Sequence, residues 1–203
     1  MFAETRSGKP ALLRIMTAIL LAVAGLAYVG TAAADPAPYT ARAVLCYYDF
    51  SNQQIQQIGK GRTITTGTVL VWRLISDDSP LMNGWEYLED NTNLNKNDKG
   101  KLWGHLEMYP DAAYDVGLEG YTGYFEENYN LKTKDGLVGV YTGTGSLNGV
   151  TATYAGVPGA PESCPEDPPL PAALCGPVYD CVPTTGTPLE GFVWSLGGVI
   201  ESD

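Results

Sequence analysis

Apolar and polar residues alternate along most of the chain beyond residue 40, the pattern of half-buried β-strands. The alternating segments are rich in Val, Ile, Thr, Tyr and Trp, which favour strands. No segment past residue 57 shows a helical period. The pattern therefore predicts strands within residues 41–50, 62–76, 84–90, 101–109, 115–130, 137–157 and 191–201.

Polar segments rich in turn-forming residues separate these strands. Residues 51–61 (SNQQIQQIGKG) predict a loop or a single helical turn, and residues 91–100 (NTNLNKNDKG) predict a loop. A short KTKDG turn is expected at 132–136, and Pro and Gly dominate residues 158–190. The whole pattern indicates about seven or eight strands joined by turns, without helices between them.

Glycines inside the predicted strands favour a barrel over a sandwich. Gly in a strand marks sharp coiling, a bulge or a close backbone approach, and the strands of a small closed barrel need such coiling. We therefore predict an all-β fold, a small antiparallel barrel of about eight strands, with a sandwich as the alternative. The last strand is expected to pair with the first and close the barrel. The glycines concerned are Gly67, Gly104, Gly117, Gly120, Gly123, Gly139, Gly143 and Gly145.

The first 34 residues have the pattern of a secretory signal peptide. Three basic residues precede an apolar run at 15–29, and small residues with an A-x-A ending follow. The run is shorter than the ~20 residues of a membrane-spanning helix. We expect cleavage after Ala34, a single domain at 35–203, and a secreted or periplasmic protein without stable membrane insertion.

Charge narrows the range of partners. The predicted signal holds three of the 12 basic and one of the 23 acidic residues, which leaves a mature net charge of −13. Nucleic acids and anionic lipids are bound by clustered Lys and Arg, and the mature sequence has no run of basic residues. Nucleic-acid binding is therefore not expected.

The mature chain has four cysteines, and an even number in an exported chain indicates disulfides. Four cysteines allow three pairings. Three of them lie in the Pro-rich segment, so we expect one bridge within it and one back to the first strand. Their spacing is not that of a zinc site, and the only His is distant, so neither a metal nor a cofactor is predicted. The cysteines are Cys46, Cys164, Cys175 and Cys181.

Candidate site residues are polar or aromatic positions on the predicted strands. His105 and Glu107 share one strand face with Trp103 and Tyr109, and a His–Glu pair can perform acid–base chemistry. The alternative is a polar outer face with the core on the opposite side. Aromatic side chains could instead line an apolar pocket or form a sugar-stacking platform. The candidates for ligand binding are Trp72, Trp103, Tyr109 and Tyr121.

The stretch GTGSLNGV at 143–150, followed by the strand TATY, contains three closely spaced glycines. It resembles the G-x-G-x-x-x-G hairpin of allene-oxide-cyclase and dirigent-type barrels, and the resemblance covers residues 115–157. The resemblance implies an eight-stranded barrel with an apolar cavity that binds or steers small hydrophobic molecules, in many members as an oligomer. None of that group's catalytic acid or arginine motifs is recognisable, so no catalytic residue is carried over.

Three functions follow from these observations. The first is a secreted barrel that binds a small hydrophobic molecule or guides its cyclisation or isomerisation. The alternative is an extracellular or envelope module that binds carbohydrate or protein without catalysis. A glycan-cleaving enzyme that uses two of the acids ranks last, because no catalytic motif is present. Whether the chain is an enzyme stays open.

Overall fold

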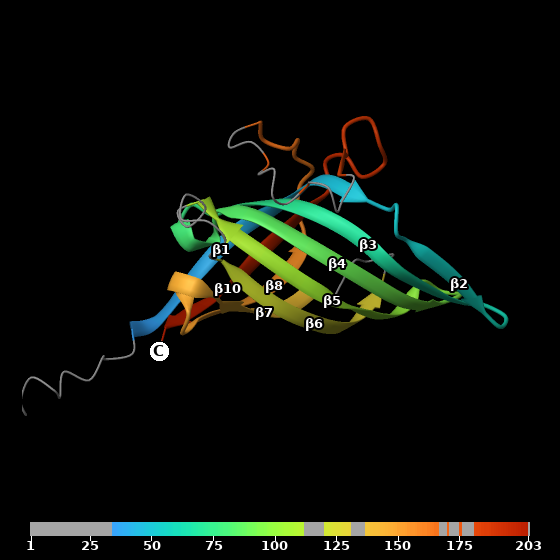
Figure 1. The fold of residues 1–203 in the computed structure, drawn as a ribbon, viewed down its shortest axis with the longest axis horizontal. Helices are drawn as coiled ribbons and strands as arrows, with labels where there is room; N and C mark the ends of the chain where they lie inside the picture. Colours follow the sequence, from blue (N-terminus) through green and yellow to red (C-terminus); the bar gives the residue numbers. More distant parts are fainter. Residues whose placement is uncertain are drawn as a thin grey trace, which may run out of the picture. The chain divides into compact units, whose positions relative to one another are not determined.

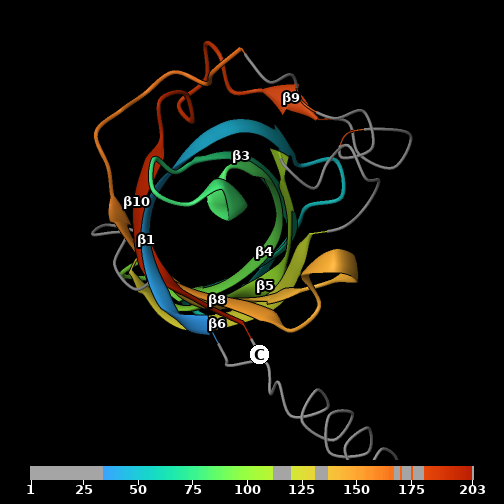
Figure 2. The same cartoon turned by 90° about the vertical axis from the view of Figure 1, so that its left-hand side faces the viewer.

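Eight antiparallel strands close into a barrel (Figures 1 and 2). Their order around the barrel is β3-β4-β5-β6-β7-β8-β10-β1, and β1 pairs with β3 to complete the ring. The prediction of a barrel is confirmed, and the sandwich alternative is wrong. The bounds are β1 (Ala34–Asp49), β3 (Arg62–Ile75), β4 (Gly84–Asn95), β5 (Lys99–Pro110), β6 (Tyr121–Asn130), β7 (Leu137–Gly143), β8 (Val150–Pro158) and β10 (Val193–Ser202).

The structure is a computed structural model that describes residues 34–111, 120–130, 137–166, 170, 175 and 181–202. Residues Asp35–Ser202 form one compact unit, and the description below concerns that unit. The predicted signal sequence lies outside the described residues except for Ala34, as does the turn expected at 132–136. No helix in the described part of the chain has the length and apolarity needed to cross a bilayer.

The terminal strand closes the barrel as expected, because β10 lies between β8 and β1. It pairs with β8 along its whole length, from Trp194 opposite Pro158 to Ser202 opposite Val150. The strand structure predicted at 137–157 is also confirmed, as a hairpin. There β7 and β8 are joined by a single 3₁₀ turn, η2 (Gly145–Leu147), and Gly145 takes a φ of 59° that favours glycine.

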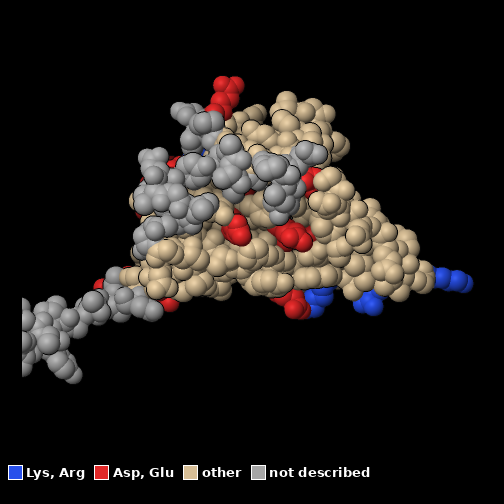
Figure 3. Space-filling model, viewed as in Figure 1, with Lys and Arg blue, Asp and Glu red and all other residues tan. Residues whose placement is uncertain are grey.

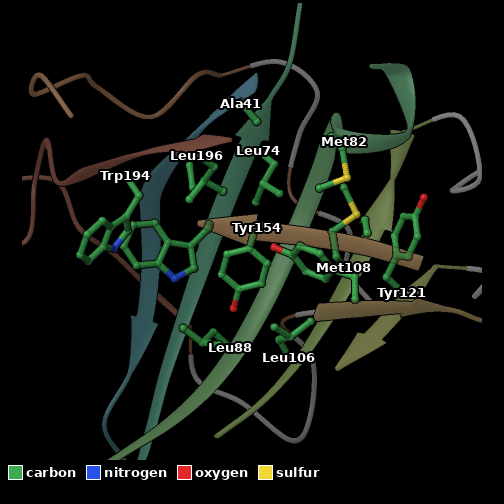
Figure 4. Close-up of a cluster of buried hydrophobic side chains, with 14 of the residues drawn as sticks. Ala41, Leu74, Met82, Leu88, Leu106, Met108, Tyr121, Tyr154, Trp194 and Leu196 are labelled. Carbon is green, nitrogen blue, oxygen red and sulfur yellow. The ribbon is translucent and has the colours of Figure 1, made fainter. Parts of the chain in front are cut away.

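The alternation of the sequence places apolar side chains inside the barrel (Figure 4). Burial of this surface is the main favourable contribution to folding. On β5 the inner face carries Leu102, Leu106 and Met108, so the predicted core side of this strand is confirmed. The other buried members of the interior cluster are Tyr39, Ala41, Ala43, Leu45, Trp72, Leu74, Met82, Leu88, Tyr121, Phe125, Tyr141, Ala152, Tyr154, Trp194 and Leu196.

A short 3₁₀ helix, η1 (Pro80–Met82), fills one mouth of the barrel. Figure 2, which looks into this mouth, shows the helix in green inside the ring of strands. Met82 is fully buried, and its side chain meets that of Met108 (Figure 4). The side chain of Asn83 fixes the connection: its Oδ1 accepts from the backbone N–H of Ser76, and its Nδ2 donates to the Ser76 carbonyl.

Two segments predicted as loops are strands. Residues 51–61 contain β2 (Gln54–Ile58), which pairs with the start of β3, and residues 91–100 continue β4 and begin β5. Both predictions were wrong because backbone pairing with a neighbouring strand outweighs the weak strand propensity of Gln and Asn. The true turns are three residues each, at 59–61 and 96–98, where Gly59, Gly61 and Asp98 have positive φ.

These hairpins gather basic residues that are dispersed in the sequence. Lys60 and Lys96 lie in the two turns, while Arg62 begins β3 opposite Asn95 and Lys99 begins β5. In Figure 3 several of the Lys and Arg atoms lie at the end where Figure 1 places β2. The absence of a basic run in the sequence therefore did not exclude a basic cluster in the structure.

A second apolar cluster lies on the outer surface of β1, β3, β4 and the start of β10. It contains Val44, Val71, Trp85, Tyr87 and Val193, and it packs against described residues of the Pro-rich segment. The disulfide Cys46–Cys164 joins that segment to β1, and Cys175–Cys181 closes within it. The expected arrangement, with one bridge within the segment and one to the first strand, is confirmed. The bridges stabilise a segment with little core of its own and fit an oxidising compartment.

Candidate functional site

The barrel interior widens at the end opposite η1 into a cavity of about 320 Å³. Inward-facing side chains of β1, β3, β4, β5, β6 and β10 form its wall, and residues 188–192 lie along it. Most of the wall is apolar. The lining residues are Leu45, Phe50, Thr68, Leu70, Trp72, Leu88, Asp90, Thr92, Leu102, Tyr129, Pro188, Leu189, Phe192 and Trp194.

The register of β3 and β4 brings the polar part of the wall together. Thr68 lies directly opposite Asp90, and Leu70 lies opposite Leu88. The register shifts between Thr65 and Thr68, a bulge in which Gly67 has a φ of 72°. A Cβ at Gly67 would lie 2.6 Å from the carbonyl oxygen of Asn52. Glycine is therefore required there for β3 to present Thr68 to the cavity.

Asp90 is the carboxyl group of this cavity. The hydroxyl of Thr68 donates a hydrogen bond to it, and Thr68 Oγ1 in turn accepts from Gln53 Nε2 at 3.0 Å. Burial raises the pKa of Asp90 to about 7 because an ionised carboxylate is poorly solvated there. No Lys, Arg or His is among the described residues that line the cavity. At neutral pH the carboxyl is thus divided between its ionised and protonated forms.

Aromatic rings form much of the remaining wall. The Phe192 ring lies 5.7 Å from Trp72 and 5.7 Å from Trp194, measured between centroids, the latter edge-on. These tilted contacts restrict the rotation of all three rings. The indole Nε1 of Trp72 is buried and has no hydrogen-bond partner among the described residues. The wall therefore combines an aromatic surface with one partly buried carboxyl, while the Trp72 indole nitrogen itself is enclosed.

A second inward carboxyl, Glu86, belongs to the packed part of the barrel. It is buried, and its Oε1 accepts a hydrogen bond from Tyr141 Oη at 2.8 Å. Burial raises the pKa of Glu86 to about 7, with the Tyr141 hydrogen bond as a smaller opposing effect. Burial likewise raises the pKa values of Tyr141 and Tyr39, and the Glu86 charge adds to both. Glu86 does not line the cavity.

No known relative identifies the chain. No protein-family model matches it, and searches of curated proteins and of solved structures also find no match. The cavity and the surface must therefore carry the functional argument.

The predicted His–Glu pair lies on the outer surface of β5, where His105 and Glu107 are both partly exposed. His105 Nε2 is 3.4 Å from Glu107 Oε1, and the Tyr109 hydroxyl donates to Glu107 Oε2 at 2.5 Å. The His105 ring is 6.1 Å from that of Tyr124 on β6. The shared face is as expected, but the cavity is on the opposite side of the strand.

The four predicted ligand-binding residues are divided between the two sides of the barrel. Trp72 lines the cavity. Tyr121 is buried in the packed interior, 5.9 Å from the Tyr141 ring, and does not line the cavity. Trp103 and Tyr109 belong to the outer face of β5. The four residues therefore do not form one site.

Sequence reasoning missed Asp90, Thr68 and Phe192. Asp90 ends the strand predicted at 84–90 and lies two positions after Leu88, so it shares the strand face of Leu88. That period could have placed Asp90 inside the barrel. For metal binding, the described residues contain no group of three or more His, Cys, Asp or Glu side chains that could hold an ion.

Proposed function

We propose that this protein is an exported barrel that binds a small apolar molecule in the cavity at its open end. The observation that carries the proposal is the cavity itself, about 320 Å³ and lined mainly by apolar and aromatic side chains. Pockets that bind small molecules typically measure about 300–1,000 Å³ and combine apolar walls with a few polar groups. Asp90, Thr68 and Thr92 supply such groups.

Export is the second part of the proposal. The signal-like segment at 1–34 supports it, and the two disulfides are those of a protein folded in an oxidising compartment. Expression with the complete N-terminus, followed by N-terminal sequencing of the purified protein, should give a chain that begins at Asp35. Retention of residues 1–34 would contradict cleavage at this position.

The proposal is limited to binding. Guided cyclisation or isomerisation, implied by the resemblance to allene-oxide-cyclase and dirigent-type barrels, stays a prediction. A barrel fold alone does not determine function. The cavity does hold a carboxyl whose pKa of about 7 would suit proton transfer, and Asp90 is therefore the first residue to test once a ligand is known.

Binding of a hydrophobic fluorophore to residues 35–203 tests the cavity. We expect the dye's fluorescence to rise while the circular dichroism spectrum stays native. Thr92→Phe places a ring in the cavity wall and should reduce binding about tenfold or more, because dye and ring compete for the same volume. Gln56→Phe is the matched control, since Gln56 is exposed on β2. No binding by the native protein, or equal binding by both variants, would contradict the proposal.

A second candidate function rests on the outer surface of β5 and β6. Tyr124 is 74% exposed beside His105, and Trp103 lies on the same face of β5. Exposed aromatic rings on a sheet can stack on sugar rings or bind a protein partner. Tyr124→Ala should abolish retention on glycan or protein arrays if this surface binds. Unchanged retention of the variant would remove this candidate.

A further inference from the structure

We propose that the cavity selects amphipathic amines, which are small molecules with an apolar body and a protonated amino group, and that Asp90 is the counter-ion of that group. The inference rests on the proposed ligand-binding function and names its ligand class. It depends on three observations: the direction of the hydrogen bonds at Asp90, the position of the nearby positive charges, and the aromatic character of the wall.

The hydrogen bonds at Asp90 leave its carboxylate as an acceptor. Gln53 Nε2 donates to Thr68 Oγ1, so the Thr68 hydroxyl proton is available for Asp90. The carboxylate of Asp90 therefore accepts a hydrogen bond from Thr68, and Asp90 is one of the residues that line the cavity, so its other acceptor sites are open to a ligand. A ligand that fills these sites must donate hydrogen bonds. An ammonium group donates up to three.

No described Lys or Arg lines the cavity that holds this carboxylate: Lys60, Arg62, Lys96 and Lys99 lie in or beside the turns at 59–61 and 96–98, outside the lining. Arg73 lies on the outer side of β3, where it binds Asp111 with nitrogen–oxygen distances of 3.0 and 2.6 Å and lies over the Trp85 ring. Arg42 pairs with Glu162 and Lys101 with Glu126. A carboxylate that is partly withdrawn from water and has no counter-ion is unfavourable, and a cationic ligand would reduce that cost.

Other titratable groups near the cavity do not replace this counter-ion. Tyr129 of β6 is the other titratable side chain among the described lining residues, and it carries no positive charge. Glu86 lies deeper on β4, where Tyr141 is its hydrogen-bond donor. When ionised, both carboxyls add negative charge to the interior, which favours a cation at the cavity over an anion.

The aromatic wall is suited to the same ligand. Five aromatic side chains line the cavity: Phe50, Trp72, Tyr129, Phe192 and Trp194. Ring faces attract cations through their quadrupole, and surrounding rings with one carboxylate are a common arrangement for ammonium recognition. An anionic or strongly polar ligand would gain nothing from these rings. An amine gains from both the rings and Asp90, while its apolar body displaces water from the cavity.

Two probes of equal shape test the ligand class: 1-adamantylamine, which is cationic, and 1-adamantanol, which is neutral. Isothermal titration of residues 35–203 at pH 8 should show at least about tenfold tighter binding of the amine. Asp90→Asn should abolish the preference but keep adamantanol binding. Glu89→Gln changes the same charge at the next position of β4, outside the lining of the cavity, and should keep the preference.

The pH dependence gives a readout independent of any variant. Between pH 8 and 5.5 Asp90 becomes protonated while the amine stays charged, so amine affinity should fall more than tenfold. Adamantanol affinity should change little. The opposite result, with adamantanol bound tightly only at low pH, would show Asp90 as a donor and overturn the proposal.

Failure of this inference is distinguishable from failure of ligand binding. Equal binding of both probes by native protein and by Asp90→Asn would overturn the amine class and leave the binding function intact. The same holds if the hydrophobic fluorophore binds but neither probe does. If neither the fluorophore nor either probe binds, the proposed function itself is wrong.

Discussion

The two ends of the barrel interior are built from the same strands but are filled differently. At the η1 end, Met82 and Met108 pack with no exposed surface. At the other end, side chains from the same strands surround a cavity of about 320 Å³. The difference arises because the β3–β4 connection, which contains η1, folds into one mouth. The mouth at the other end is bordered by residues 188–192.

The two inward carboxyls of β4 make this comparison sharper. Glu86 and Asp90 are four residues apart on one face of one strand, and burial raises both pKa values to about 7. Glu86 is enclosed and bonded to Tyr141, whereas Asp90 faces the cavity. Of these two inward acidic residues, Glu86 therefore packs inside the barrel at one end, and Asp90 is available to a ligand at the other. The following variants test that separation.

The largest effect is expected from Met82→Ala at the packed end. Removal of a fully buried methionine side chain leaves a cavity, so the free energy of unfolding should fall by about 2–5 kcal/mol. Urea unfolding followed by circular dichroism measures this. Fluorophore binding at the open end should stay within about twofold of native, because Met82 does not line that cavity. A large loss of binding would show that the ends are coupled.

Glu86→Gln should change how stability depends on pH. The folded pKa of about 7 lies above the ordinary 4.5, so between these values the folded state holds a proton that the unfolded state has lost. Native stability therefore falls as pH rises from 4.5 to 7 and then levels off. Gln does not titrate, so the variant should be more stable than native at pH 8 by up to about 3 kcal/mol.

Unfolding measured at pH 5 and pH 8 checks this prediction. The gain from Glu86→Gln should shrink at pH 5, where Glu86 is protonated in the folded state. Glu89→Gln, at an outward position of the same strand, is the control and should show no such pH-dependent gain. An equal gain in stability from Glu86→Gln at both pH values would show that the gain does not come from the raised pKa of Glu86.

Gly67→Ala should affect the open end. The left-handed backbone and the nearby Asn52 carbonyl oppose any Cβ, so we expect a loss of about 1–3 kcal/mol in unfolding free energy. Because the bulge sets the position of Thr68, the variant should also weaken fluorophore binding. Gly59→Ala, which has a similar φ but open space around its Cβ, is the matched control. If Gly67→Ala and Gly59→Ala lower stability and fluorophore binding equally, backbone strain alone would explain the loss, without the Asn52 contact.

The smallest effect is expected from Leu189→Ala. Leu189 is partly buried and lines the cavity, so its removal should cost about 1 kcal/mol of stability or less. The loss of fluorophore affinity should be larger than the loss of stability, because the variant opens one side of the ligand site. A dissociation rate measured by stopped-flow fluorescence should increase. A stability loss as large as that of Met82→Ala would place Leu189 in the packed core instead.

Much of the fold was predictable because β-strands impose a period of two. The inward face of β5, with Leu102 and Leu106, and the outward face with His105 follow from that period alone. The expectation of one bridge within the Pro-rich segment and one back to Cys46 followed from the positions of the cysteines, but the choice of Cys164 as the partner of Cys46 did not. The β2 strand and the continuation of β4 to Asn95 could not be predicted, because Gln and Asn become strand residues only when a neighbouring strand supplies their backbone hydrogen bonds.

The candidate site was less predictable. Trp72 was the one predicted ligand-binding residue that lines the cavity. Phe192 precedes the last strand, and nothing local to it indicates that its ring contacts Trp72 of β3. The basic residues Lys60, Arg62, Lys96 and Lys99 likewise meet only because two hairpins lie side by side.

The sequence by itself determined the strand period, the inner and outer faces and an even set of cysteines, because these depend on local spacing and composition. The tertiary structure decided which mouth is filled, which carboxyl faces a cavity and which aromatic rings surround it. These features depend on register and closure, which join residues far apart in the chain: Thr68 meets Asp90 only after β3 and β4 pair across a bulge at Gly67.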